Sequence, residues 1–240
     1  MTSAARSPIL ISPTQVEQSL LRAFTQIWPE AFVEPPLSEP QQAVDRDCTL
    51  LDAMLAEQER GTRIRLWFNR PCVVVPHNQV RNMTLDTARD VAGALGFAVA
   101  LRRTGGTAVV HRPGVLCISL LDVADMGQAQ PANIYVPLLA GICSALEILG
   151  IRGDHGSVTG SYCDGKCNVR VGGRKIAGTA ALVRRRHGFH GTLVHAALTV
   201  WGDLQADVAA VCDVERAIGF PGNYSAEAHT SVCEELMWLS

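Results

Sequence analysis

The sequence lacks any apolar run long enough to span a lipid bilayer, which takes about 20 consecutive apolar residues in a helix. It also lacks a recognisable signal peptide, because the apolar patch in MTSAARSPILISPTQ is short, ends at Pro13 and is followed by no small-residue cleavage site. We therefore expect a cytoplasmic protein that has no membrane partner.

An excess of charge of either sign is absent as well. The chain has 21 lysines and arginines against 23 aspartates and glutamates, which gives a formal net charge of -2. A nearly neutral chain has no general attraction to nucleic acid, so we expect no nucleic-acid partner. Charge gathers only locally, since residues 152–186 hold many basic side chains but only Asp154 and Asp164 as acids.

A disulfide framework is not expected either. Most of the eight cysteines lie in apolar strings such as PCVVVP and VLCISLL, where a free cysteine behaves as a small buried hydrophobe. Disulfide-rich domains belong to oxidising compartments, and the N-terminus gives no sign of export to one.

The helix and strand patterns come in clusters along the chain. Thr14-Gln-Val-Glu17 has capping-box spacing before the helical periodicity of QSLLRAFTQIW, and the proline-rich residues 29–42 end that helix. We therefore assign residues 1–42 to an N-terminal helical arm and residues 43–240 to the main domain. Strand patterns follow one another over residues 63–80, 98–121 and 157–200. Adjacent strands favour an α+β fold with a mixed, mainly antiparallel sheet flanked by helices.

The stretch GSYCDGKCNVRVGGRKIAGTA, residues 160–180, allows three interpretations. The segment 160–166 has P-loop spacing, but Cys167 stands where a Ser or Thr ligates magnesium, and a hairpin pattern follows instead of the required helix. Cys163 and Cys167 have a spacing found in zinc sites, yet no second pair completes a site, and we expect no metal. The third interpretation makes Cys163 a nucleophile.

A nucleophilic cysteine needs nearby positive charge. An unperturbed thiol, with a pKa of about 8.5, is mostly protonated at neutral pH, and basic neighbours favour the thiolate. Lys166, Arg174 and Lys175 supply such charges. These residues alone leave a nucleophile and an idle surface cysteine equally open.

A second motif, LRRTGGTAVVHRPG, covers residues 101–114. Arg102 and Arg103 precede Gly105 and Gly106, which allow the backbone to approach a ligand closely, and His111 follows. A plain hairpin turn with solvated arginines gives the same pattern, so both interpretations stay open on this motif alone.

Together the motifs resemble those of the lipoate–protein ligase, octanoyltransferase and biotin ligase superfamily. LRRTGGTAVVHRPG is similar to its RRxxGGGxVxH signature, and VGGRKIAGTAALVRRRHGFHGTLVHAAL to its GRKxxGxA strand pair and HGTLL segment. LLDAMLAE, LWFNRPCVVVPHNQ and AHTSVCEEL resemble its opening helix, its strand pair with an Asn-Gln corner and a small helix near its end. The resemblance covers about residues 47–238 and implies that superfamily's catalytic domain, with helices on the outer face of the sheet and a tunnel for a medium-length acyl chain.

The triplet Ser161-Tyr-Cys163, upstream of the GRKxAG lysine, resembles the octanoyltransferase and lipoyl amidotransferase branch, which uses a cysteine in this loop. The resemblance implies that Cys163 attacks the acyl carbonyl and forms a thioester, while Lys175 stabilises charge on the carbonyl oxygen. It also implies a pocket with one wall from Arg102, Arg103, Gly105, Gly106 and His111 and another from Gly178 and Thr179. For His111 a proton shuttle and a structural histidine both stay open.

On this resemblance, residues 43–240 form an acyltransferase catalytic domain that moves an octanoyl or lipoyl group to the lysine of a lipoyl domain, in lipoate biosynthesis. The implied partners are acyl carrier protein and lipoyl domains, such as glycine cleavage H protein or 2-oxoacid dehydrogenase E2 subunits, and no cofactor is required. One alternative is an ATP-dependent lipoate–protein ligase, which needs ATP and magnesium. Another is a non-catalytic module that binds lipoate or a carrier without turnover.

Two departures from the family pattern affect these expectations. Thr107 replaces the third glycine of the turn, which predicts a slightly less open approach for the ligand. Asn168 falls near where ATP-dependent ligases usually carry an Asp beside an Asn, which disfavours adenylate and magnesium binding. Biotin is disfavoured because the GRGRxxxxW signature of biotin ligases is missing. We interpret Arg184–Arg186 as a solvated run, with salt-dependent docking of acidic carriers as the alternative.

Overall fold

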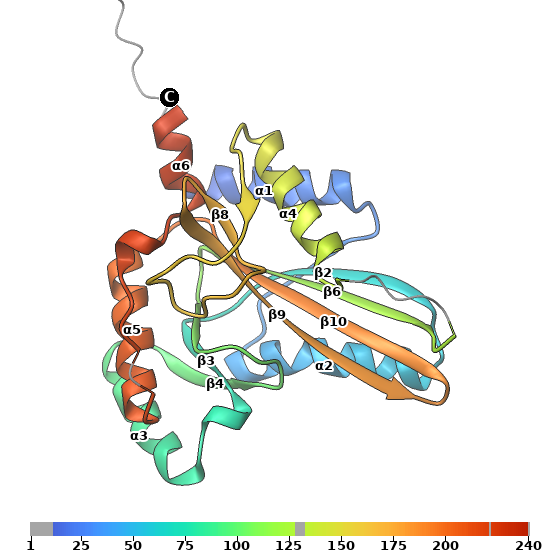
Figure 1. Cartoon of the computed structure of the whole chain (residues 1–240), viewed down its shortest axis with the longest axis horizontal. Helices are drawn as coiled ribbons and strands as arrows, with labels where there is room; N and C mark the ends of the chain where they lie inside the picture. Colours follow the sequence, from blue (N-terminus) through green and yellow to red (C-terminus); the bar gives the residue numbers. More distant parts are fainter. Residues whose placement is uncertain (1–11, 128–132, 221, 240) are drawn as a thin grey trace, which may run out of the picture.

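A computed structural model describes residues 12–127, 133–220 and 222–239 of the chain. Two sheets and the helices packed on them make up the fold (Figure 1). The helices are α1 (Pro13–Ile27), α2 (Pro40–Ala56), α3 (Asn82–Ala94), α4 (Val136–Ile148), α5 (Leu204–Ala217) and α6 (Val232–Leu239), with the 3-10 turns η1 (His77–Gln79) and η2 (Ala226–Ala228). The strands are β1 (Phe32–Glu34), β2 (Gly61–Phe68), β3 (Cys72–Pro76), β4 (Ala98–Arg102), β5 (Val109–His111), β6 (Val115–Asp125), β7 (Asp154–His155), β8 (Val169–Val171), β9 (Arg174–Arg186) and β10 (Phe189–Thr199).

The larger sheet has seven strands in the order β1-β2-β6-β10-β9-β8-β7. All its neighbours pair antiparallel except β1 and β2, which run parallel. The smaller sheet has the order β4-β3-β5, with β3 parallel to β4 and antiparallel to β5. The expected α+β fold with a mixed, mainly antiparallel sheet is therefore confirmed.

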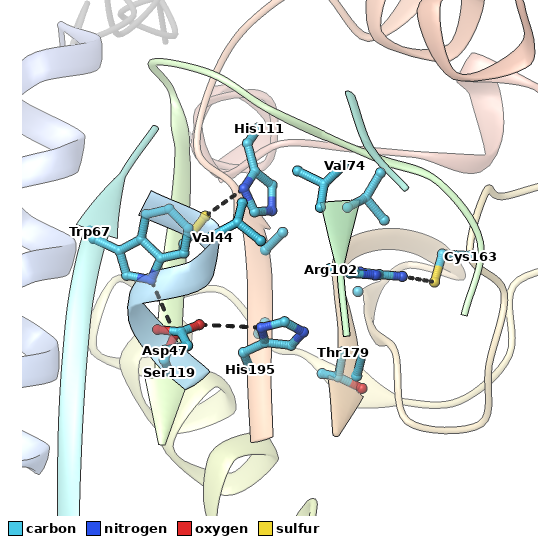
Figure 2. Close-up of a pocket in the computed structure, with 16 residues that line it drawn as sticks. Val44, Asp47, Trp67, Val74, Arg102, His111, Ser119, Cys163, Thr179 and His195 are labelled. Atoms are coloured by element: carbon cyan, nitrogen blue, oxygen red, sulfur yellow. Dashed lines mark hydrogen bonds and ion pairs between the residues drawn. The ribbon is translucent and has the colours of Figure 1, made fainter. Parts of the chain in front are cut away.

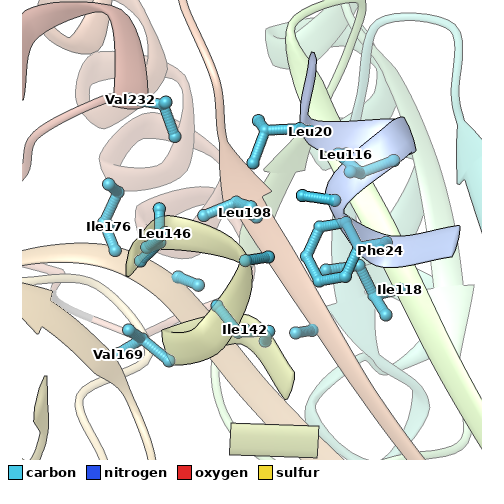
Figure 3. Close-up of a cluster of buried hydrophobic side chains, with 14 of the residues drawn as sticks. Leu20, Phe24, Leu116, Ile118, Ile142, Leu146, Val169, Ile176, Leu198 and Val232 are labelled. Atoms are coloured by element: carbon cyan, nitrogen blue, oxygen red, sulfur yellow. The ribbon is translucent and has the colours of Figure 1, made fainter. Parts of the chain in front are cut away.

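Helices cover both faces of the larger sheet. On one face, α1 and α4 bury Phe24 and Ile142 against Ile118 and Leu198 of the central strands (Figure 3). On the opposite face, α2 buries apolar side chains such as Leu51 against β6 and β10. The resemblance implied helices on one outer face. Helices occupy both faces here because the long strands carry apolar side chains on each side.

The smaller sheet lies between the larger sheet and the pair α3 and α5. Its strand β3 is buried along its whole length, which agrees with the unbroken apolar string CVVVP. Val208, Val211 and Val214 of α5 and Ala88 and Ala92 of α3 belong to the core that covers it. This packing fixes the turn between β4 and β5, which carries the motif RRTGGT.

The N-terminal helix begins earlier than the sequence pattern predicts. The capping box is formed by Ser12 and Gln15, so its assignment to Thr14 and Glu17 is wrong. Gln15 N–H donates to Ser12 Oγ over 3.3 Å, and Ser12 N–H donates to Gln15 Oε1 over 2.9 Å. Pro13 favours this start, because a helix leaves its first N–H groups without an intrahelical partner and proline has none to satisfy.

Helix α1 is packed into the main core through Val16, Leu20 and Phe24. The division of the chain at residue 42 stays a prediction, and α2 already begins at Pro40. Residues 1–11 of the expected arm lie outside the described part of the chain. Within residues 12–127, 133–220 and 222–239, no helix combines the length and the apolar character that crossing a membrane requires.

The segment 157–168 is irregular, although we expected strands to begin at residue 157. It consists of turns and bends, and regular pairing starts only at β8. Two left-handed residues, Gly160 with φ +83° and Cys163 with φ +49°, interrupt an extended path.

Candidate active site

Cys163 lies on this irregular segment, just before β8. Its side chain is buried, and its left-handed backbone is uncommon for a residue that carries a Cβ. The buried side chain of Asn168 donates from Nδ2 to the Cys163 carbonyl oxygen over 3.3 Å. Because the segment leads into a strand and not a helix, it is not a P-loop.

The turn between β4 and β5 lies directly against the sulfur of Cys163. The Thr107 N–H donates to Sγ over 3.4 Å, and Thr107 Oγ1 accepts the Cys163 N–H over 2.9 Å. Gly106 has φ +100°, and a Cβ built on it would lie 2.7 Å from Sγ. A Cβ on Gly105 would meet no atom within 4 Å. The second glycine is therefore the one that the cysteine contact requires, and Thr107 holds the cysteine from both its backbone and its hydroxyl.

The two arginines of the motif have different surroundings. Arg102 is buried, and its Nη2 donates to Thr107 O over 2.7 Å and to Cys163 Sγ over 3.7 Å. Its Nε is buried without a partner among the described residues, and no carboxylate pairs with it there. Arg103 is exposed and lines an open groove with Asp45, His77 and Asn78, and Arg102 reaches both this groove and the pocket that holds Cys163. The structure thus brings Arg102 to the cysteine and leaves Arg103 outside.

Lys175, the second residue of β9, lies on the other side of Cys163. Its Nζ donates to the carbonyl oxygens of Tyr162 over 2.5 Å and of Cys163 over 3.1 Å. An ammonium has three N–H donors, so one remains for a substrate. A Cβ on Gly178 would lie 2.9 Å from Lys175 Nζ, which shows that this glycine makes room for the lysine.

The positive charges of Arg102 and Lys175 both lower the pKa of Cys163. Burial by itself raises the pKa of Cys163, but the Arg102 and Lys175 charges and the Thr107 N–H more than offset it, so the net shift is downward. Burial lowers the pKa of Lys175 to about 8, against an opposing contribution from the Cys163 thiolate. By contrast, burial raises the pKa of Cys72 to about 12 and raises that of Cys117 well above its usual value. Cys163 therefore differs from Cys72 and Cys117 in that its surroundings favour the thiolate.

A narrow pocket extends from Cys163 between the two sheets (Figure 2). Cys163 and Arg102 lie at one side, Trp67, Asp47 and Ser119 lie at the other, and Gly178 and Thr179 belong to its wall. Its free volume is about 20 Å³, which is enough for about one water molecule. The tunnel for an acyl chain therefore stays a prediction, and the pocket must widen to admit one.

His111 also lines this pocket. Its Nδ1 lies 3.6 Å from Cys117 Sγ, and its ring meets Trp67 edge to face. Burial lowers the pKa of His111 to about 3, so the imidazole is neutral. A neutral histidine in contact with side chains fits the structural interpretation better than the proton shuttle.

Sequence reasoning missed the polar network that closes the far end of the pocket. Asp47 of α2 accepts hydrogen bonds from Arg65 Nη1 over 2.7 Å and Ser119 Oγ over 2.7 Å, and Trp67 Nε1 donates to Ser119 Oγ over 3.1 Å. His195 of β10 lies between Asp47 and the β4–β5 turn. The network joins residues of the four elements α2, β2, β6 and β10, and only Arg65 and Trp67 share one, so no local spacing marks it. The one available signal is a charged Asp47 among the apolar positions of α2.

Among residues 12–127, 133–220 and 222–239, no group of three or more His, Cys, Asp or Glu side chains is placed to hold a metal ion. Cys167 does not join Cys163, since its carbonyl oxygen accepts a hydrogen bond from Thr179 Oγ1 and its side chain packs against the main core. The basic run Arg184–Arg186 lies at the far end of β9, where Arg184 pairs with Asp52. At about 3.3 Å per residue, the run is more than about 30 Å from Lys175 along the strand.

Comparison with known proteins finds a matching family and several relatives. The family described as the lipoyl protein ligase A/B catalytic domain matches residues 39–232. An octanoyl-[GcvH]:protein N-octanoyltransferase of Kyrpidia tusciae is 36% identical over 55% of this chain and 48% of its own length. The enzyme of the same name from Geobacillus kaustophilus is 31% identical over 60% of this chain and 50% of its own length. The chain thus spans about half the length of these curated relatives. An uncharacterised protein of Cupriavidus necator is 35% identical over 80% of this chain and 79% of its own length.

Solved structures show the same fold. A lipoate-protein ligase A crystallised with ATP superposes with a TM-score of 0.64 and 22% identity, over 85% of this chain and 75% of that chain. The bipartite lipoate protein ligase of Thermoplasma acidophilum superposes with a TM-score of 0.55 and 20% identity, over 88% and 81%.

Proposed function

Because the chain belongs to the lipoyl protein ligase A/B catalytic domain family, we propose that it transfers an octanoyl or lipoyl group to the lysine of a lipoyl domain through a thioester on Cys163. One observation carries the proposal. The Cys163 sulfur is buried in the pocket against Arg102 and the Thr107 N–H, with Lys175 beside its backbone. This arrangement lowers the pKa of the Cys163 thiol and so favours the thiolate, the nucleophilic form of a cysteine.

The first half-reaction uses the thiolate as the nucleophile. Cys163 attacks the carbonyl carbon of the donor, the new C–S bond forms, and the bond to the donor's sulfur or nitrogen breaks. The remaining N–H of Lys175 stabilises the charge that develops on the carbonyl oxygen. When the donor is an amide, the leaving lysine needs a proton, and Lys175, with a pKa of about 8, donates it.

The second half-reaction reverses these roles. The amine of the acceptor lysine attacks the thioester carbon, the C–S bond breaks, and Cys163 leaves as a thiolate. When the donor is an amide, the nitrogen gives its proton to the Lys175 that the first half-reaction left neutral, which restores the ammonium. When the donor is a thioester, its thiolate leaves without a proton from Lys175. Acylation then removes the Cys163 negative charge that favours the Lys175 ammonium, so Lys175 releases its proton to solvent before it accepts the one from the nitrogen. ATP and magnesium have no part in this scheme, because the donor thioester or amide already carries the acyl group in a transferable form.

The names of two relatives pair an octanoyl-GcvH donor with a protein acceptor. We extend that pairing to this chain and include acyl carrier protein as a donor and E2 lipoyl domains as acceptors. A cytoplasmic location is part of the same proposal.

The test is to incubate the protein with octanoyl-acyl carrier protein, without ATP, and to measure its intact mass and map its peptides. We expect one octanoyl group on Cys163, its transfer to glycine cleavage H protein or an E2 lipoyl domain, and no adduct on Cys163→Ser. If acyl transfer requires free octanoate and ATP, and Cys163→Ser stays active, the protein is a ligase and the thioester route is wrong. If the protein binds lipoate or a carrier but transfers no acyl group, either from octanoyl-acyl carrier protein or from octanoate with ATP, it is a non-catalytic binding module.

A further inference from the structure

A second groove opens on the Lys175 side of the molecule, between the beginnings of α5 and α6. Its volume is about 330 Å³, and its wall includes the carboxylates of Asp203, Glu227 and Glu234. None of the three has an ion-pair partner among the described residues, while Arg174 in the same wall is paired with Glu235 outside it. The groove is therefore net negative.

The carboxylates also have local backbone and hydroxyl partners. Asp203 accepts the Ala206 N–H over 3.0 Å, Glu234 accepts the Ser231 N–H over 3.1 Å, and Glu227 accepts the Ser225 hydroxyl. A carboxylate has about four lone-pair sites, so these bonds leave capacity for a cation.

At the inner wall of the groove lies His229, a buried imidazole that is 4% exposed. Its Nδ1 lies 2.9 Å from the carbonyl oxygen of Ser225, which accepts, so the ring proton is on Nδ1. Its Nε2 is then an acceptor, and it is buried with no partner among the described residues. A buried acceptor without a partner costs free energy, which a bound N–H donor would recover.

His229 connects this groove to the catalytic lysine. It also lines a small cavity of about 10 Å³ whose wall includes Lys175, Tyr162 and Gly178. Lys175 and His229 are paired in an isolated parallel β-bridge, and both side chains reach the wall of this cavity. The Tyr162 ring stacks on His229 at 4.3 Å between centroids, and Lys175 Nζ lies 5.1 Å from the centre of the Tyr162 ring.

We propose that this groove receives the acceptor lysine of the lipoyl domain, with Asp203, Glu227 and Glu234 attracting the ammonium and His229 Nε2 accepting an N–H from its nitrogen. The proposal rests on the proposed function and adds to it a separate route for the second substrate. The acyl chain occupies the pocket on the Cys163 side, and the lysine approaches from the Lys175 side.

The chemistry balances along this route. The ammonium releases one proton to solvent in the open part of the groove and moves inward as a neutral amine. Its nitrogen attacks the thioester carbon on Cys163, the C–N bond forms, and the C–S bond breaks. The second proton passes from nitrogen to neutral Lys175, which has given its own proton to the leaving amine of an amide donor or, after a thioester donor, to solvent.

Charge removal tests the outer part of the groove. The triple variant Asp203→Asn, Glu227→Gln, Glu234→Gln removes three charges but keeps a side-chain oxygen as hydrogen-bond acceptor at each position, including the N-cap of α5. We expect at least about a tenfold slower transfer from octanoyl-Cys163 to glycine cleavage H protein at low salt, with the difference shrinking at high salt. Loading of Cys163 from octanoyl-acyl carrier protein and release of the octanoyl group by hydroxylamine, a small neutral nucleophile, should stay within twofold.

The matched control removes the same charge elsewhere. Glu30, Glu39 and Glu57 are exposed, have no ion-pair partner among the described residues and do not line the groove. Their triple change to Gln should leave transfer unaltered. The proposal is overturned if the groove variant transfers the octanoyl group as fast as the unaltered protein. It is also overturned if the groove variant and the control variant are slowed equally.

The pair His229→Phe and His229→Gln tests the inner wall. Phenylalanine keeps a ring against Tyr162 but has no acceptor, whereas glutamine offers an amide oxygen. We expect His229→Phe to slow transfer to the lipoyl domain at least about fivefold without slowing hydroxylamine release, and His229→Gln to restore part of the rate. Equal loss toward both nucleophiles assigns His229 a structural role and removes it from the proposal.

Binding without chemistry separates this proposal from the transferase reaction itself. Calorimetric titration of unmodified H protein into the unloaded Cys163→Ser protein should show weaker binding after the groove charges are removed. Unaltered binding in that titration contradicts the groove even if the thioester forms. Weaker binding supports the groove even if Cys163 carries no acyl group and the proposed function fails.

Discussion

The Cys163 sulfur lies 3.7 Å from Nη2 of Arg102, a buried guanidinium with no carboxylate partner among the described residues. A buried charge without a counter-charge is costly. The thiolate of Cys163 supplies that counter-charge, so the arginine and the cysteine stabilise each other's charged forms. The first arginine of the motif thus acts on the nucleophile in addition to forming a wall of the pocket.

Replacing Arg102 by Gln should raise the pKa of Cys163, because the largest charge opposing burial is removed. Alkylation of Cys163 by iodoacetamide, followed across pH by mass spectrometry, should shift to higher pH, because the thiolate then forms at higher pH. Arg103→Gln is the control, because Arg103 is exposed and does not contact the sulfur. Equal shifts in both variants would contradict a direct contact.

Gly106→Ala should damage the site far more than Gly105→Ala. The new methyl group at Gly106 would collide with Cys163 Sγ and with Arg102 Nη2, 2.8 Å away, on a backbone with φ +100°. Strain of this kind costs about 1–3 kcal/mol, so thioester formation should fall by at least about tenfold. Burst amplitude with octanoyl-acyl carrier protein measures it, and Gly105→Ala should match the unaltered protein because its methyl group meets no atom within 4 Å.

The pH dependence of loading should be bell-shaped. The rate rises as Cys163 becomes a thiolate, below the ordinary range of thiols because its pKa is lowered, and falls near pH 8 as Lys175 loses its proton. Lys175→Arg keeps the positive charge, so its profile with octanoyl-acyl carrier protein should lose the alkaline fall. The same variant should fail with octanoyl-H protein, since arginine donates no proton to a leaving amine. An unaltered fall near pH 8 in Lys175→Arg would remove Lys175 from this role.

Glu215 of α5 should position the turn that carries Thr107. It is 1% exposed, its Oε1 accepts the Ala108 N–H over 2.8 Å, and its Oε2 accepts the Tyr224 hydroxyl over 2.7 Å. Glu215→Leu leaves the N–H of buried Ala108 without its acceptor, which costs about 1–3 kcal/mol, and also removes the acceptor of the half-buried Tyr224 hydroxyl. Urea unfolding measures the loss, and Glu215→Gln, which keeps an oxygen for Ala108, should lose much less. Similar losses in both variants would mean that packing, not hydrogen bonding, sets the stability here.

Local patterns predicted the N-terminal helix and most of the strands, but not β1 or β7, and they began the last group of strands too early, at residue 157. The turn at Asn69–Pro71 separates β2 from β3, and two glycine-containing turns separate β4, β5 and β6. The periodicity of apolar residues does not indicate which sheet each strand joins. β2 and β3 are neighbours in sequence but belong to different sheets, because β2 pairs with β6 and β3 with β4.

The sequence indicated which residues belong to the candidate site but not which of them are in contact. Cys163, Lys175, Gly106 and Gly178 do come together, and their catalytic roles remain predictions. The role of Thr107 was not predicted. From the sequence, a side chain in place of the third glycine suggests only less space for the ligand, whereas in the structure its hydroxyl accepts a hydrogen bond from the Cys163 N–H. His229 was not predicted as a site residue, because it lies 54 positions after Lys175 in the chain. Only the β-bridge between the two residues in the folded protein brings the histidine to the site.

The nucleophile and its counter-charge come from different sheets. Cys163 precedes β8 of the larger sheet, while Arg102 ends β4 of the smaller one. The lowered pKa of the Cys163 thiol therefore exists only once the two sheets have docked. In a chain whose smaller sheet has separated, Cys163 loses the Arg102 charge, so the pH at which Cys163 is alkylated reports tertiary assembly and gives the protein a built-in folding probe.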